Sequence, residues 1–513
     1  MKPREPRLSK SRYITGLQCP KRLWLGWHDP EPRSEPEPGT ILAVGTEVGV
    51  AARLLVPGGV LVEEGPDRHA EAVERTRHLI TDPAVPAISE AAFAFDRVLI
   101  RADILERLPS GRWRLAEVKS TTRVKPEHLH DLAIQAYVIT GSGFPVEEMQ
   151  LVHVDTSYVR GENEIDWHAY FEREDVTAEV RGLLPSVPER VAEMHVILSL
   201  PTAPEIRPSG HCFSPYPCEF WDRCTADKPA DWIINLPRLK AAMFAELDGS
   251  GIESMRDIPP DFPLTPGQQR VVNAVVSGRE FISDELRDAI TALAPPTSYL
   301  DFETFSPAIP LYAGTRPYQR IPFQWSMHHD DGAGEVCHFE FLADGGADPR
   351  RVFAETLIEA ISRTTGPIAV YSPFEATVLR ALAAFFPDLS GSLFVAIDRM
   401  VDLLPIIKSH VTHPEFLGSN SIKVVAPALV PGFSYDDLNG VADGNDASAV
   451  FYRLATDRSL SDEDRGRYRR ALLAYCGRDT LALMDVHCIL RSYPCSASAG
   501  EGEQGLLSNP SVA

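Results

Sequence analysis

The residues of this chain best suited to bind a metal are four cysteines that lie far apart in the sequence. Cys19 is near the start, whereas Cys212, Cys218 and Cys224 form a C-x5-C-x5-C run rich in Pro, Tyr and Trp. Bringing Cys19 to the other three closes a loop of about 190 residues, which costs roughly 4–5 kcal/mol of chain entropy. Structural thiolate sites bind metal with apparent energies on the order of 10 kcal/mol, which can offset that cost. The pattern predicts a metal clasp; the alternative is four unrelated buried cysteines.

A second set of residues combines carboxylates with an amine. The runs between residues 91 and 120 are rich in β-forming residues, and a Pro-Ser-Gly turn predicts an antiparallel hairpin. Glu117 and Lys119 point to one side because strand side chains alternate, and Asp103 can join them from the neighbouring strand. Asp103 and Glu117 suit Mg²⁺, while Lys119 can orient water and stabilise charge on a phosphate. The alternative is an exposed strand face.

A third set of residues is acidic and lies in the second half of the chain. Asp301 and Glu303 are two apart on a predicted strand and share a face, and Tyr475 and Asp479 share a helix face. With Glu375 they form a predicted acidic cluster, which like-charge repulsion destabilises unless cations fill it. Two metals about 4 Å apart can bind the attacking water and the leaving oxygen of a phosphodiester. A capped strand end is the alternative for the first two residues.

The composition bounds what these residues can belong to. The 513 residues are 44% hydrophobic and 24% charged, which is typical of a globular protein of two to four domains. No apolar run is long enough to span a membrane, the first residues lack a signal core, and eight cysteines suit the cytoplasm better than a disulfide framework. The sequence contains no Walker loop, so it does not predict an ATP-driven helicase.

The net charge of −22 argues against a nucleic-acid partner only weakly, because local patches can differ from the average. Residues 1–24 are basic and could face phosphate or form a solvated tail. Their cations are Lys2, Arg4, Arg7, Lys10, Arg12, Lys21 and Arg22.

Helices and strands are predicted in an order that divides the chain. We expect helices over residues 11–24, 44–55, 68–80, 236–247, 352–363 and 375–383, and strands over 297–304, 321–329, 335–342 and 367–371. The rest of the second half is predicted to be mostly helical. Between residues 226 and 295, the pattern of helix, Gly-containing turn and helix indicates either a helix-hairpin-helix element or a structural linker. The tail over 493–513 is rich in Ser, Gly and Glu and is predicted to be disordered.

Together with the following helix, the carboxylates and lysine of the first half resemble a known nuclease core. Asp103, the Glu117-Val-Lys119 triplet and the run over 131–137 resemble the PD-(D/E)XK nucleases, with the RecB-like branch the most similar. The resemblance implies a role for Gln135 on that helix. Tyr137 does not match the family's tyrosine cleanly. Glu47 is a weak match to an additional N-terminal metal or substrate ligand.

The cysteine pattern narrows this resemblance. One early and three late cysteines around the core resemble the CRISPR-associated Fe–S exonucleases and the AddB-type helicase–nuclease. This implies a [4Fe–4S] cluster on Cys19, Cys212, Cys218 and Cys224. A zinc site remains the alternative, although zinc favours gaps of two to four residues.

The second half resembles the DEDD exonucleases on an RNase H-like fold. The Asp-Phe-Glu motif and Tyr-x3-Asp spacing point to the Tyr-bearing subclass, which removes nucleotides from 3′ ends, and Ala474 stands where the other subclass has histidine. The resemblance implies metal binding by Asp301, Glu303, Glu375 and Asp479, with Tyr475 holding the water. Glu375 departs from the family's aspartate; Asp398 and Asp402 rank lower as substitutes.

With these two halves and the segment over 419–444, the chain resembles a bacterial family that joins an Fe–S nuclease domain to an RNase H-like domain. The predicted architecture is α/β: a PD-(D/E)XK Fe–S domain over 1–225, a helical connector over 226–295 and an RNase H-like domain over 296–492. The implied activity is Mg²⁺- or Mn²⁺-dependent hydrolysis of DNA with single-stranded ends, in repair, recombination or defence, with a helicase or defence-system partner. A related version has RNA as the substrate of the C-terminal half. The alternative is a non-catalytic or single-headed nucleic-acid-binding protein in which one fold, first of all the C-terminal one, is a scaffold.

Overall fold

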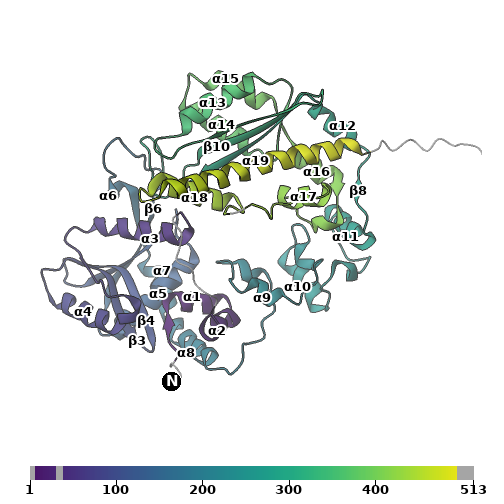
Figure 1. The fold of residues 1–513 in the computed structure, drawn as a ribbon. Coiled ribbons are helices and arrows are strands. Elements are labelled where there is room, and N and C mark those ends of the chain that lie inside the picture. Colours follow the sequence, from purple (N-terminus) through teal and green to yellow (C-terminus); the bar gives the residue numbers. More distant parts are fainter. Residues whose placement is uncertain (1–5, 31–38, 439, 494–513) are drawn as a thin grey trace, which may run out of the picture.

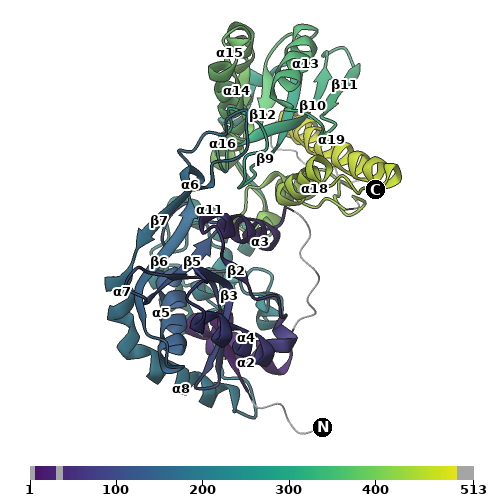
Figure 2. The same ribbon diagram turned by 90° about the vertical axis from the view of Figure 1, so that its left-hand side faces the viewer.

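The chain folds into two α/β units that are joined by a helical connector. The computed structural model describes residues 6–30, 39–438 and 440–493. The predicted disordered tail lies, apart from Tyr493, outside these residues, as do the first five residues of the basic segment. Figures 1 and 2 show the first unit below and the second above, with α3 and α6 at their junction. Within the described part of the chain, no helix is long and apolar enough to cross a membrane.

The first unit is built around a mixed sheet with helices on both faces. Its strands run in the order β2-β3-β4-β5-β6-β7, and β1 pairs in parallel with β4. They are β1 (Leu8–Ser9), β2 (Val60–Leu61), β3 (Ala87–Phe95), β4 (Val98–Arg107), β5 (Trp113–Lys119), β6 (Val146–Val154) and β7 (Phe171–Asp175). The hairpin predicted over the second and third β-rich runs is present as the antiparallel β4–β5 pair.

Each face of this sheet has its own apolar core. One core is formed with α1, α4, α5, α7 and α8, and the other with α3. The helices are α1 (Lys10–Gln18), α2 (Pro20–His28), α3 (Ile41–Ala52), α4 (His69–Thr81), α5 (Pro126–Gly141), α6 (Trp167–Tyr170), α7 (Thr177–Leu183), α8 (Val187–Leu198) and α9 (Trp221–Thr225). The one helix predicted over 11–24 is wrong, because Pro20 forces Cys19 into an extended conformation and divides it into α1 and α2.

The connector is helical but differs from its prediction. It contains α10 (Ala241–Gly249), α11 (Pro266–Ser277), β8 (Phe281–Ile282) and α12 (Leu286–Ile290). The helix expected from residue 236 begins five residues later, after Arg238, which has a positive φ of 53°. Residues 250–265, which include a single 3-10 turn, separate α10 from α11. Both alternatives for this segment, the helix-hairpin-helix element and the structural linker, stay predictions.

The second unit has a five-stranded sheet in the order β11-β10-β9-β12-β13. The first three strands are antiparallel neighbours, whereas β12 pairs in parallel with β9 and β13. The strands of this sheet are β9 (Thr297–Phe305), β10 (Ile321–Asp330), β11 (Val336–Leu342), β12 (Ile368–Val370) and β13 (Met400–Asp402), while β14 (Val411–Thr412) pairs separately with β8. Of these strands, β13 and β14 were not predicted. The last two were missed because a two- or three-residue strand depends on its tertiary partner rather than on a local pattern.

Helices surround this second sheet, and the longest crosses the whole unit (Figure 1). They are α13 (Arg350–Ser362), α14 (Phe374–Phe385), α15 (Ser390–Asp398), α16 (Leu403–His410), α17 (Ile422–Leu429), α18 (Gly444–Thr456) and α19 (Asp462–Ser492). One core packs α13, α14 and α15 on β9 and β10, and a second packs α12, α16, α17 and α19 together. The chain is thus mixed α/β throughout.

The loop that follows β9 docks on the first unit. Ala308 packs in the core under α3, and its carbonyl oxygen accepts a hydrogen bond from Tyr170 Oη at 3.0 Å. Tyr318 Oη donates to the carbonyl oxygen of Ser120, the residue directly after Lys119. The strand that carries Asp301 and the strand that carries Lys119 are therefore connected through one interface.

Candidate functional site

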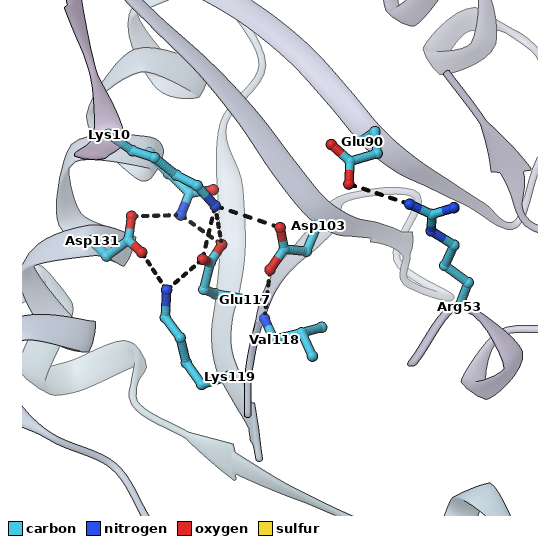
Figure 3. A network of polar contacts seen from close by, with 9 residues as sticks. Lys10, Arg53, Glu90, Asp103, Glu117, Val118, Lys119 and Asp131 are labelled. Atoms are coloured by element: carbon cyan, nitrogen blue, oxygen red, sulfur yellow. Dashed lines mark hydrogen bonds and ion pairs between the residues drawn. The ribbon is translucent and has the colours of Figure 1, made fainter. Parts of the chain in front are cut away.

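The first candidate site lies between β4, β5 and α5 (Figure 3). Lys119 Nζ lies 2.7 Å from Glu117 Oε1, as the strand alternation predicts. Asp103 Oδ2 accepts a hydrogen bond from the Val118 amide at 2.8 Å, which orients its carboxylate beside Glu117. The three residues predicted to act together are thus brought together.

Helix α5 supplies two further groups to this site. Gln135 Nε2 donates to Glu117 Oε2 at 2.8 Å and to Asp131 Oδ1 at 3.2 Å. Asp131 Oδ2 lies 2.5 Å from Lys119 Nζ, so this carboxylate fixes the lysine from the helix side. The resemblance pointed to Gln135, whereas Asp131 was not assigned a role, although its spacing of four from Gln135 places both on one helix face.

Lys10 is the residue of this site that the sequence did not reveal. Its Nζ lies 2.8 Å from Glu117 Oε1 and 3.1 Å from Oε2, and 3.4 Å from Asp103 Oδ1 (Figure 3). Lys10 is the first residue of α1, directly after Ser9, which caps the helix. The pairing of β1 with β4 places it beside the carboxylates. The available signal was a basic residue directly after a capping serine, which alone indicates no site.

The two lysines determine the charge state of the first site. Burial raises the pKa of Glu117, but the charges of Lys10 and Lys119 outweigh it and hold that pKa well below its usual range. Burial and the charge of Glu117 raise the pKa of Asp103 to about 7. Burial lowers the pKa of Lys119, but Asp131 and Glu117 reverse this and keep the amine charged. The site therefore holds its own compensating cations.

The two weaker matches to the nuclease family, Glu47 and Tyr137, make their hydrogen bonds elsewhere. Glu47 on α3 makes its hydrogen bond with Tyr452 Oη of the second unit, at 2.7 Å, and so contributes to the interface between units. Tyr137 Oη donates to Asp96 Oδ2 at 3.0 Å and packs edge-on against Phe95. Neither side chain makes a hydrogen bond to the carboxylates described above.

The second candidate site lies where β9 meets α19. Asp301 and Glu303 come from β9, and Asp479, 8% exposed, comes from α19. Asp479 Oδ1 accepts a hydrogen bond from Tyr435 Oη at 2.8 Å, and Tyr475 also hydrogen-bonds its carboxylate. The strand pair and the helix pair predicted from spacing thus meet in one acidic cluster, and Tyr435 is an addition that the sequence did not reveal.

The electrostatics of the second site differ from those of the first. Burial, and then the charge of Asp479, raises the pKa of both Asp301 and Glu303 well above their ordinary values. Lys423, whose Nζ lies 4.6 Å from the Tyr475 ring centroid, lowers the pKa of Glu303 and Asp479 only in part. The carboxylates of this site therefore lack a cation in direct contact among the described residues.

Glu375 belongs to the electrostatic surroundings of this cluster. It begins α14, is 3% exposed, and its Oε2 atom is buried without a hydrogen-bond partner. Burial raises its pKa to about 8. Asp402 lies close enough to contribute to that shift but caps α16 by accepting from Leu404 N at 2.9 Å. Asp398 is exposed at the end of α15, which removes it as a substitute.

Asp301, Glu303 and Cys476 could together hold a metal ion. Their ligand atoms lie within 4.8 Å of one another, and they are the only His, Cys, Asp or Glu trio so placed among the residues described. Cys476 Sγ is 3.7 Å from the carbonyl oxygen of Asp301 and 3.8 Å from its Oδ2. The sequence reasoning assigned no cysteine to this half, and the only signal was its place between Tyr475 and Asp479.

The four clasp cysteines meet in the structure. Cys19 at the start of α2, Cys212 in a 3-10 turn, Cys218 and Cys224 line one small hollow. Gln18 holds the far segment by donating to the carbonyl oxygens of His211 and Tyr216, at 2.8 and 2.7 Å. No three of the cysteine sulfurs lie within 4.8 Å of one another.

Comparison with known proteins gives little beyond the second unit. Residues 298–421 match a family described as a domain of unknown function, DUF2779. No curated protein matches the chain. A solved structure described as the crystal structure of SSO0001 matches at 13% identity, over 40% of this chain and 81% of that one, with a TM-score of 0.18. At that score the likeness carries no argument about the fold.

Proposed function

We propose that the chain is a two-headed, metal-dependent nuclease. The observation that carries the proposal is the presence of two buried carboxylate clusters in one chain, each assembled from separate elements. Carboxylates gather in a protein interior only where cations compensate their charges or protons neutralise them. The α/β architecture of both units agrees with the PD-(D/E)XK and RNase H-like folds implied by the resemblances. The expectation of DNA over RNA rests on the resemblance alone.

In the second head, the residues divide into ligands and positioning groups. Asp301, Glu303 and Asp479 would hold divalent cations, and the unpartnered Oε2 of Glu375 provides a further oxygen. When bound, such cations supply activation of the attacking water and stabilisation of the leaving 3′ oxygen. Tyr475 would hold the water in line with the phosphorus. The bond from the water oxygen to phosphorus forms as the P–O3′ bond to the remaining strand breaks, so the terminal nucleotide leaves with its 5′ phosphate, as expected for release from a 3′ end.

In the first head, Lys119 has the central role. Asp103 and Glu117 would hold Mg²⁺ or Mn²⁺, since carboxylate oxygens are the ligands that these hard cations prefer. Lys119 is held by Glu117 and Asp131 and stays protonated, so it can donate to a phosphate oxygen as negative charge develops there. Gln135 keeps Glu117 in place.

The clasp is proposed to hold a [4Fe–4S] cluster that joins the two ends of the first unit. The meeting of the four cysteines in one hollow, which Lys21 and Arg22 also line, supports a metal site, and the resemblance favours the cluster over a single zinc ion. The cluster would contribute stability by closing the long loop, and no step of the hydrolysis involves it.

A second candidate function is a single-headed nuclease whose first unit binds nucleic acid without cutting it. Lys10 favours it, because its ammonium group already bridges the two carboxylates that would bind metal. The scaffold would then be the N-terminal unit, whereas the sequence alone pointed to the C-terminal one.

A digestion assay on end-labelled single- and double-stranded DNA and RNA with Mg²⁺ or Mn²⁺ tests both. Wild type is compared with Lys119→Ala and with Asp301→Asn/Glu303→Gln. Two-headed function requires that each variant lose a different part of the product pattern. If only the second variant loses activity, the single-headed function holds; if wild type cuts nothing, the nuclease proposal is wrong.

A further inference from the structure

A basic groove lies between the connector and the second unit. Its volume is about 560 Å³, within the usual range of ligand-binding clefts of about 300–1,000 Å³. Its walls are the segment before α10, the start of α11, the end of α16 and the loop that leads into α17. We name this feature the connector groove, and its cations are Arg238, Lys240, Arg270 and Lys408.

The charge of the connector groove is unusual for this protein. Four cations line it and no carboxylate does, although acidic residues outnumber basic ones by 72 to 50 in the chain. Among the ion pairs between described residues, none involves any of the four. Arg238, Lys240 and Lys408 are exposed. Clustered cations that form no ion pairs repel one another and are typical of a surface that binds an anionic chain.

Two of the segments that line the groove, the end of α16 and the loop into α17, lead towards the acidic cluster of the second head. Helix α16 has Lys408 near its end in the groove, and Asp402, which interacts with Glu375, caps its start. Eight residues of helix span on the order of 12 Å. On the other wall, Asn420 lines the groove and Lys423 lies beside Tyr475.

We infer that the connector groove binds the sugar–phosphate backbone of a single strand and directs its 3′ end to the second head. This inference rests on the proposed nuclease function and adds a substrate path to it. About twelve ångströms is farther from the scissile bond than the single phosphate of a dinucleotide reaches. The groove should therefore contact phosphates upstream of the scissile bond and be irrelevant to a dinucleotide.

The test is a charge reversal in the groove with a matched control. The groove variant is Arg238→Glu/Lys408→Glu. The control is Arg279→Glu/Arg287→Glu, which changes the same charge on exposed connector residues outside the groove. Binding of a fluorescent 20-nucleotide single strand is measured by anisotropy in Ca²⁺ over a range of salt, and hydrolysis of a dinucleotide is measured in Mn²⁺.

The groove variant should bind the strand at least tenfold more weakly than the control. Its plot of log affinity against log salt should flatten by about 1.4, since each lost phosphate contact on a single strand removes about 0.7. Hydrolysis of the dinucleotide should be unchanged in both. Equal binding by the groove and control variants overturns the inference and leaves the nuclease proposal standing. If wild type binds no strand and cleaves no dinucleotide, the proposed function fails together with the inference.

Discussion

The two carboxylate sites of this chain handle the same electrostatic problem in opposite ways. In the first, Lys10 and Lys119 lie within hydrogen-bond distance of Glu117 and keep its pKa low. In the second, no described lysine or arginine contacts Asp301 or Glu303, and their pKa values rise. Without metal, the lysines compensate the carboxylates of the first site, whereas the carboxylates of the second site are stable only when they are protonated. A bound cation must therefore displace an amine in one site and protons in the other.

The largest effect is expected from removing the charges of the second site. Asp301→Asn/Glu303→Gln keeps the shape of both side chains but removes two metal ligands, so release of nucleotides from 3′ ends should fall on the order of 10³-fold or more. Single-nucleotide product from a 3′-labelled strand is the measurement. Lys119→Ala is the matched control, and it should leave this product unchanged. An unaffected double variant would show that the acidic cluster does not catalyse.

A cysteine substitution should separate the two regions by stability. Cys19→Ser removes one ligand of the proposed cluster, and structural metal sites contribute on the order of 10 kcal/mol, comparable with the whole stability of a domain. The first unit should lose its structure and activity, while 3′-end release persists. Absorbance near 400 nm and limited proteolysis report the first unit. Loss of both activities would show that the interface at Ala308 and Tyr318 makes the second unit depend on the first.

The part of these sites that the sequence predicted follows from local geometry. Glu117 and Lys119 share a strand face, Asp301 and Glu303 share another, and Tyr475 and Asp479 share a helix face, because the chain's own periodicity places them so. The prediction that separate pairs come together in one site rested on the resemblance to nuclease families. The contacts between elements far apart in the chain could not be predicted from the residues.

Lys10 shows why. It is 93 residues from Asp103 and 107 from Glu117, and it reaches them only because β1 pairs with β4. A two-residue strand has no periodicity to detect. The same holds for the loop at Ala308, whose burial depends on a partner surface in the other unit.

The comparison predicts that Lys10 competes with metal at the first site. Two unit charges at 4 Å interact by about 4 kcal/mol at an effective dielectric constant of 20, so Lys10→Met should tighten Mn²⁺ binding at least tenfold. The measurement is the loss of the free Mn²⁺ EPR signal, in the Asp301→Asn/Glu303→Gln background so that the first site dominates. Lys10→Arg keeps the charge and should show no gain. Equal affinity in Lys10→Met and wild type would show that the lysine leaves the metal position free.

The raised pKa of Glu375 predicts that the stability of the fold depends on pH. Glu375 has a pKa of about 8 in the folded chain and an ordinary value near 4.5 when unfolded, so the folded state binds the extra proton between these limits. Its contribution to stability is complete below about pH 4.5 and is lost as pH rises towards 8. Without metal, Glu375→Gln should gain stability over wild type by about 1.4 kcal/mol per pH unit in this window. Urea unfolding in EDTA measures it, and a constant difference across pH would contradict the buried proton.

The smallest effect is expected at Cys476, which distinguishes the second site from an all-oxygen one. A thiolate favours Zn²⁺ and Co²⁺ over Mg²⁺, whereas carboxylates favour Mg²⁺ and Mn²⁺. Cys476→Ser should therefore weaken Co²⁺ binding about three- to tenfold, remove its sulfur-to-cobalt absorbance, and leave Mg²⁺ binding nearly unchanged. Cys488→Ser, an exposed cysteine on the same helix, is the control. Co²⁺ spectra that are identical in Cys476→Ser and wild type would mean that the thiol only packs beside Asp301, and that Asp301 and Glu303 set the metal preference alone.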